Sequence, residues 1–155
     1  MGEVTTNIRV QTADFDVGVE IAALHQGDGR VGAVATFVGI VRDLNDERDV
    51  STMTLEHYPG MTERALEQIA QDAISRWSLL GVTIIHRVGT LQPTDQIVLV
   101  AVSSAHRQDA FDACAFMMDF LKTKAPFWKR ETGDEGARWV GYRDSDGQAA
   151  ERWES

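Results

Sequence analysis

The chain has 155 residues, which is enough for one compact domain of ordinary size. It is 43% hydrophobic and 25% charged, and 24 acidic against 15 basic side chains give a net charge of −9. This acidic balance disfavours a general nucleic-acid binder and a protein of anionic membrane surfaces, because both need spare positive charge.

The cysteine and histidine content bears on the compartment and on metal binding. One cysteine excludes an internal disulfide and favours a reducing compartment. Four scattered histidines give no metal-ligand spacing. No apolar run approaches the roughly 20 residues that span a bilayer, and the first 15 residues lack the basic and apolar regions of a signal peptide. We therefore expect a cytoplasmic protein with no bound metal.

Hydrophobic periodicity predicts the elements of the first half of the chain. Alternation of apolar and polar residues indicates half-buried strands, and a run rich in Val, Ala, Phe and Ile indicates a buried one. Strands are expected at residues 7–11, 31–41 and 51–58, helices at 16–25 and between Pro59-Gly60 and Gly81, and a charged loop at 43–49. The second of these helices is the clearest, because its apolar residues fall at helical spacing from Leu66 to Trp77.

The second half predicts one further helix among strands. Strands are expected at 82–88, 96–102, 127–131 and 138–142, and a helix from a Ser103-Ser104 cap to about Lys124. Apolar residues nearly encircle this helix, which indicates burial on more than one side. Pro126 disfavours a helical residue before it and so ends the helix.

The order of these elements predicts the fold class. Three pairs of successive strands have no helix between them, which disfavours a doubly wound parallel sheet. We expect an α+β fold with a mixed, mostly antiparallel sheet and two main helices packed on it. Residues 1–143 would form one domain, followed by an acidic, flexible tail at 144–155.

Residues 27–32, Gly-Asp-Gly-Arg-Val-Gly, match the dinucleotide-binding fingerprint. That motif must leave a strand and open a helix, so that the pyrophosphate meets the helix N-terminus. Here the predicted order is reversed, with a helix before the motif and a strand after it. We interpret the match as a helix-to-strand loop and reject a nucleotide site.

The scarce positive charge is concentrated at residues 121–130, which hold four of the 15 cations and no acidic residue. Two interpretations remain open for this segment, a solvated face or an anion site, and the helix dipole alone accounts for Lys122 and Lys124. Two further candidates for binding an anion are the helix start at Ser103–Arg107 and Arg42 at a strand end. At the first of these, a capped helix with an exposed arginine is the commoner interpretation.

Nucleophiles other than lysine are poorly supported. No nucleophile elbow or triad spacing is present, and Cys114 lies among Ala113, Ala115 and Phe116, where burial keeps a thiol protonated. A lysine crowded by other cations has a lowered pKa and can act as a base or nucleophile. Lys122 and Lys129 would have such surroundings if the fold brings them together.

Three stretches closely resemble the large, catalytic subunit of molybdopterin synthase. They are Leu55-Glu56-His57-Tyr58-Pro59-Gly60-Met61, Ser104-Ala105-His106-Arg107 and Lys122-Thr123-Lys124-Ala125-Pro126-Phe127-Trp128-Lys129-Arg130. The segment Ile85-His86-Arg87-Val88-Gly89 also matches, and the similarity extends from about Val31 to Trp139. The resemblance implies an α/β-hammerhead fold and a sulfurtransferase of molybdenum cofactor biosynthesis.

In this family, cyclic pyranopterin monophosphate becomes molybdopterin by gaining two sulfurs as a dithiolene. The resemblance implies that the sulfur arrives as a thiocarboxylate on the C-terminal Gly-Gly of a small ubiquitin-like partner. It also implies a homodimer of this chain with one small subunit at each end, a heterotetramer whose active site is shared across the dimer.

Matching positions imply the site residues. Lys122 would be the principal catalytic lysine and Lys129 the second. Arg42, His106 and Arg107 would hold the phosphate and pterin edge, and Arg130 and Glu131 would line the pocket. One departure is Asp43, a carboxylate beside Arg42 where bacterial relatives often have an amide. The alternatives to this enzyme are a non-catalytic scaffold subunit that binds a phosphopterin or nucleotide, and an interaction protein whose cations are merely solvated.

Overall fold

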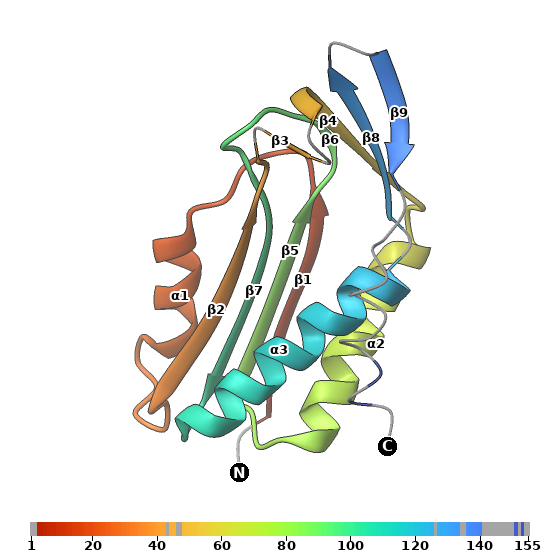
Figure 1. The fold of residues 1–155 in the computed structure, drawn as a ribbon. Helices are drawn as coiled ribbons and strands as arrows, with labels where there is room; N and C mark the ends of the chain where they lie inside the picture. The colour runs from red at the N-terminus through yellow and green to blue at the C-terminus, as the bar shows by residue number, and fades with distance from the viewer. Residues whose placement is uncertain are drawn as a thin grey trace.

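The computed structural model describes residues 3–42, 44–45, 48–125, 127–133, 136–140, 151 and 153. At 44–45, 48–51, 128–133 and 136–140 it describes the backbone. Two sheets and three helices make up the described chain (Figure 1). No helix of the described residues is long and apolar enough to cross a membrane.

The first of the two layers is a four-stranded sheet in the order β1-β5-β7-β2. Its strands are β1 (Thr5–Gln11), β2 (Ala33–Ile40), β5 (Gly81–Arg87) and β7 (Gln96–Ser104). Strand β1 pairs with β5 in parallel, and the other two pairings are antiparallel. The two central strands are almost wholly buried, as apolar strands covered on both faces must be.

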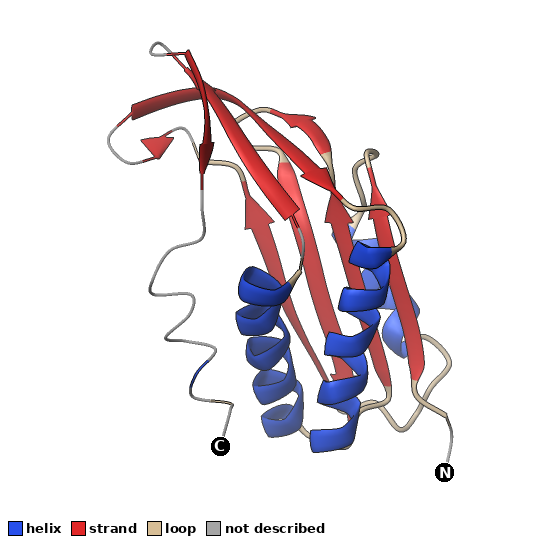
Figure 2. Ribbon diagram, turned by 90° about the vertical axis from the view of Figure 1, so that its right-hand side faces the viewer, coloured by secondary structure: helices blue, strands red, loops and turns tan. Residues whose placement is uncertain are grey.

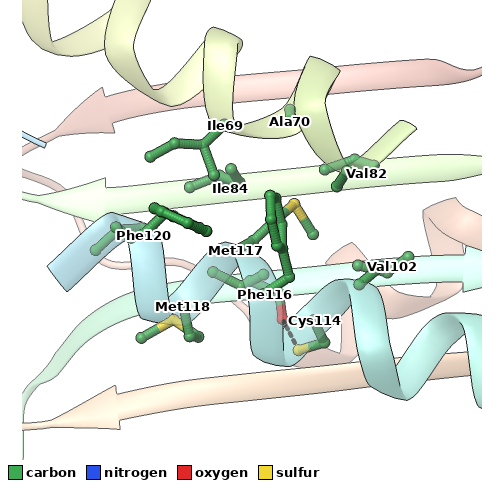
Figure 3. Close-up of a cluster of buried hydrophobic side chains, with 14 of the residues drawn as sticks. Ile69, Ala70, Val82, Ile84, Val102, Cys114, Phe116, Met117, Met118 and Phe120 are labelled. Atoms are coloured by element: carbon green, nitrogen blue, oxygen red, sulfur yellow. Dashed lines mark hydrogen bonds between the residues drawn. The ribbon is translucent and has the colours of Figure 1, made fainter. Parts of the chain in front are cut away.

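Helices α2 (Met61–Arg76) and α3 (Arg107–Lys124) lie side by side on one face of this sheet (Figures 1 and 2). Their facing side chains and those of the sheet form the main core, in which Leu66, Ile84 and Met117 are fully buried. Figure 3 shows this cluster between the two helices and the strands. The near-encircling apolar pattern of α3 has its explanation here, because that helix packs against α2, β2 and β7.

Helix α1 (Val17–His25) covers part of the opposite face. Asp16 caps it, because its carboxylate accepts a hydrogen bond from the backbone N–H of Val19 at 3.1 Å. Val17 and Leu24 pack on a second cluster whose members are Phe15, Ile85, Leu99 and Ala101. The sheet is therefore sandwiched, with the thicker layer on the α2–α3 side.

The second layer lies across the end of the first sheet at which β1, β2 and β5 finish (Figure 1). It comprises β3 (Leu44–Asn45), β4 (Arg48–His57), β6 (Gly89–Leu91), β8 (Phe127–Gly133) and β9 (Gly136–Val140). Strand β4 is its centre, pairing antiparallel with β3, β6 and β8. Met53 and Leu55 of β4 pack with Val41 and Leu91 in a third buried cluster, which joins the layers.

The predicted α+β class with two main helices on a mixed sheet is confirmed. Three local expectations were wrong. The charged stretch at 43–49 holds β3 and the start of β4 where a loop was expected, the short β6 was not expected, and α3 begins at Arg107 after an N-cap at His106. Ser104 instead accepts a hydrogen bond from the His106 N–H and donates one to the Ser78 carbonyl.

The predicted domain boundary at 143/144 lies outside the described residues. Of the predicted tail, Glu151 and Trp153 are described, and Trp153 lies against α2 and α3. Its indole contacts Trp77 and Phe116 edge-on, and its Nε1–H donates to Asp119 Oδ2 at 2.6 Å. The boundary and the flexibility of the remaining tail stay predictions.

Candidate active site

Three of the predicted site residues lie at the end of the first sheet that carries the second layer. Arg42 follows β2 and is exposed, and Lys122 is exposed in the last turn of α3. Lys129 lies in β8, where its backbone pairs with Leu55 of β4. Helix α3 runs antiparallel to β7, so its C-terminus returns to the end where β7 begins beside Ile40. The fold thus brings the two predicted catalytic lysines and Arg42 to one end of the molecule.

His106 and Arg107 lie at the opposite end. They follow β7, whose last residue, Ser104, pairs with Ala33 at the start of β2. Both side chains are exposed at the N-terminus of α3, where free N–H groups and the helix dipole favour an anion.

The length of α3 separates these two groups within one chain. Lys122 comes fifteen positions after Arg107, and a rise of 1.5 Å per residue places their backbones about 22 Å apart. One chain therefore does not bring all of the predicted residues into a single pocket. Only residues from a second chain can complete a pocket that holds both groups.

The remaining predicted positions are partly outside the described structure. Arg130 and Glu131 lie in β8, paired in backbone register with Thr54 and Met53. Asp43 is outside the described residues. No group of three or more His, Cys, Asp or Glu side chains among the described residues is placed to hold a metal ion.

The loop that resembles a dinucleotide fingerprint has the predicted connection, from α1 into β2. Gly27 adopts a φ of 75°, which favours glycine. Gly32 is needed for a different reason, because a Cβ there would collide with the carbonyl oxygen of Ala105. Its N–H donates to the Ser104 carbonyl at 3.0 Å. Gly32 thus allows the loop to pack closely against Ala105, next to His106. These two glycines do not form a phosphate-binding turn at the start of a helix.

Cys114 is buried in the main core, 8% exposed, with its sulfur 3.8 Å from the Val100 carbonyl oxygen (Figure 3). Burial raises the pKa of this thiol to about 11. At neutral pH it is protonated and enclosed by hydrocarbon, as the sequence predicted. It has neither the ionisation nor the access that a sulfur carrier requires.

Three aromatic rings beside the lysine-bearing strand were not assigned a role from the sequence. Phe127 opens β8, and its ring stacks on that of His86 from β5 with a centroid distance of 3.7 Å and an interplanar angle of 17°. His57 lies on β4 as the register partner of Phe127, and the centroids of these two rings are 6.4 Å apart with an interplanar angle of 31°. The sequence signal was available, since His57 and His86 lie in two of the stretches quoted for the resemblance, but their proximity was not.

The fold defines a class, an α+β protein in which the end of α3 with Lys122 and the strand with Lys129 lie at the same end of the first sheet and the sole cysteine is buried. A family model described as MoaE protein matches residues 10–124. A protein of Ralstonia nicotianae named molybdopterin synthase catalytic subunit is 60% identical over 146 residues, which cover 94% of this chain and 83% of that protein. The chain belongs to the MoaE family.

Solved structures agree with this assignment. The Burkholderia ambifaria structure titled "Molybdopterin biosynthesis MoaE protein" has a TM-score of 0.83 and 54% identity, covering 97% of this chain and 99% of that one. A Helicobacter pylori structure, titled as a complex of subunits 1 and 2 of molybdopterin-converting factor, has a TM-score of 0.65 and 18% identity, covering 90% of each chain. At that identity the likeness concerns the fold.

Proposed function

We propose that this chain is the catalytic subunit of a molybdopterin synthase, a sulfurtransferase of molybdenum cofactor biosynthesis. The observation that carries the proposal is the 60% identity across nearly the whole chain to a protein of that name. The placement of Lys122 and Lys129 at the same end of the fold supports it, because sulfur transfer from an anionic thiocarboxylate to an anionic substrate needs positive charges close together. A cytoplasmic location belongs to the same proposal and is supported by the single free cysteine.

The substrate in this proposal is cyclic pyranopterin monophosphate, and the sulfur donor is the C-terminal thiocarboxylate of a small ubiquitin-like subunit. A thiocarboxylate is anionic, so the ammonium group of Lys122 would hold its sulfur near the substrate carbon that accepts it. Lys129 would assist in binding the substrate and in proton transfer. Arg130 and Glu131 would line the pocket from the same strand. No metal or redox cofactor enters this scheme.

The substrate phosphate would be held by Arg42 of one chain and by His106 and Arg107 of a second copy. The separation of about 22 Å along α3 supports this division, because it prevents one chain from placing all of these groups around one small ligand. If the start of one α3 meets the end of the other in a two-fold dimer, the symmetry repeats that contact and completes both sites. The small subunit would approach the end that carries Lys122.

The experiment that tests the proposal is a complete reaction. The chain is incubated with cyclic pyranopterin monophosphate and a thiocarboxylated small subunit, and the dithiolene product is measured. Product formation that requires all three components is expected. A chain that binds both partners without forming product would instead be the scaffold subunit considered above, and the proposal would be wrong.

A further inference from the structure

We propose that His86, Phe127 and His57 form a ring stack that positions the lysine-bearing segment, which makes the two histidines and Phe127 positioning residues for sulfur transfer. This inference rests on the proposed function. It concerns residues that touch neither the substrate nor the thiocarboxylate in that scheme. The ring stack, as we name these three residues, acts through the chain on either side of Phe127.

The ring stack joins the two layers of the fold. His86 comes from β5 of the first sheet and is 5% exposed, whereas Phe127 and His57 come from β8 and β4 of the second. The near-parallel rings of His86 and Phe127, 3.7 Å apart, leave little room for the start of β8 to slide. Phe127 also packs against the main core, whose members come from the first sheet, α2 and α3. The side chain of Phe127, on β8 of the second sheet, therefore contacts both the first sheet and the core under the helices.

The position of Phe127 in the chain explains why this tie matters. Helix α3 ends at Lys124, Ala125 is extended, and the Phe127 N–H donates to the Ala125 carbonyl at 2.9 Å. The chain therefore turns from helix to strand immediately before the ring. Lys122 lies five residues before Phe127 and Lys129 two residues after it. A rotation of Phe127 would displace both lysines, and it would displace them relative to each other.

The two histidines contribute fixed, flat surfaces. The Nδ1 of His86 lies 2.8 Å from the Arg87 carbonyl oxygen, and because a carbonyl only accepts, the Nδ1–H is the donor there. This bond sets the plane of the ring. The Nδ1 of His57 is buried and has no hydrogen-bond partner among the residues that the structure describes. Among the described residues, the contact of the His57 ring with Phe127 is what includes His57 in the ring stack.

The consequence for catalysis is large even though the displacement is small. Reacting groups must meet within a few tenths of an ångström of the productive distance, and a misplacement of 1 Å can lower the rate about a hundredfold. Loss of positioning acts on the chemical step, so it lowers kcat while leaving substrate binding nearly unchanged. A residue that only stabilises the fold lowers the amount of folded enzyme and does not change kcat per folded molecule.

The test compares the variants Phe127→Leu, His86→Leu and the double variant, each checked for folding by circular dichroism and thermal unfolding. Leucine keeps an apolar side chain and removes the flat face. We expect each single variant to lose about tenfold or more in kcat, with less than about a twofold change in the KM for the pterin. The double variant should lose no more than the worse single variant, because the two rings act as one unit. Losses that multiply, or an unchanged kcat, would overturn the inference.

Two further variants separate positioning from stability. His86→Phe restores a ring at the stacked position and should return kcat to within about threefold of wild type, even where the lost hydrogen bond lowers the Tm. Ile69→Val removes one methylene from the same main core, at a residue of α2 that is not part of the ring stack. It should lower the Tm and leave kcat unchanged. A loss of kcat in Ile69→Val equal to that in Phe127→Leu would show that core stability, not the ring stack, governs the rate.

His57→Phe tests the third ring. This variant removes the unsatisfied nitrogen and keeps the ring, so the Tm should rise while kcat stays within about threefold of wild type. A large loss of kcat would mean that the imidazole takes part in proton transfer, and the positioning role of His57 would be wrong. Wild-type turnover is measured first. Its absence would refute the proposed function, whereas normal wild-type turnover with insensitive variants refutes this inference alone.

Discussion

The separation of Arg107 from Lys122 along α3 makes a quantitative prediction about mixed dimers. Arg107→Ala and Lys122→Ala remove groups from opposite ends of α3. Each variant should be nearly inactive when the pterin concentration is well below the KM of Arg107→Ala, because the first variant loses substrate binding and the second loses turnover. If every site combines Lys122 of one copy with Arg107 of another, a dimer that contains one copy of each variant has one doubly damaged site and one intact site.

The expected activity follows from counting. Random exchange of equal amounts of the two variants gives mixed dimers as about half of the population, and half of their sites are intact. The mixture should therefore recover about a quarter of the wild-type activity, although neither component has appreciable activity. The distance of about 22 Å along an 18-residue helix excludes recovery by a rearrangement within one chain.

The assay is dithiolene formation after the variants have been unfolded together and refolded, with separately refolded variants mixed afterwards as the control. A Lys122→Ala and Lys129→Ala pair serves as a second control. Both lysines lie at the same end of one chain, so each site in the mixed dimer lacks one of them and no recovery is expected. Recovery in that control, or none in the first mixture, would refute the division of the site between two copies.

Further predictions concern substitutions of the two lysines, of Arg107 and of Trp153. Lys122→Ala and Lys129→Ala should each lower turnover about a hundredfold or more without unfolding the chain, as measured by single-turnover kinetics; near-normal turnover in Lys122→Ala would contradict its catalytic role. Arg107→Ala should weaken substrate binding by about 1.5–3 kcal/mol, mainly in KM, and added salt should weaken the wild type in the same sense; unchanged affinity at low salt would place the phosphate elsewhere. Trp153→Ala should lower the free energy of unfolding by about 2 kcal/mol, because two edge-on ring contacts and the bond to Asp119 are lost. Trp153→Phe should restore part of this, and a change below about 0.5 kcal/mol by urea unfolding would show that the indole is not held there.

The helices and long strands could be predicted from the sequence because local periodicity determines them. The apolar positions of α2 recur at helical spacing, and β5 and β7 are nearly continuous apolar runs. Strands β3 and β6 have two and three residues. Segments this short carry no periodicity, and they are strands only because β4 lies beside them. The charged residues at 43–49 favour a loop locally, and tertiary pairing overrides that preference.

The residue types of the candidate site could also be predicted, whereas their arrangement could not. The cluster of cations at 121–130 is visible in the sequence. A predicted helix that ends near Lys124 also implies a large distance between Arg107 and Lys122. The ring stack was not predictable, because its three rings come from strands that are distant in sequence and meet only where the two sheets join. Register decides that contact, and register depends on the whole sheet.

The core position of Cys114 constrains the route of sulfur. A cysteine that carries sulfur as a persulfide must ionise and must be reached by the donor, yet this thiol has a pKa of about 11 and lies between α3 and the sheet. The printed sequence contains one cysteine, so this chain has no second thiol to take over the role.

The sulfur of a transferase built on this fold must then arrive already activated on another molecule. The part left to this chain is to bind two anions and move protons between them. Exposed lysines and arginines at the two ends of α3 suit that task, and replacing Cys114 with alanine should leave it intact, at a cost of about 1 kcal/mol in stability. Loss of dithiolene formation by a folded, partner-binding Cys114→Ala variant would mean that the sulfur passes through the core thiol and that the lysine scheme is wrong.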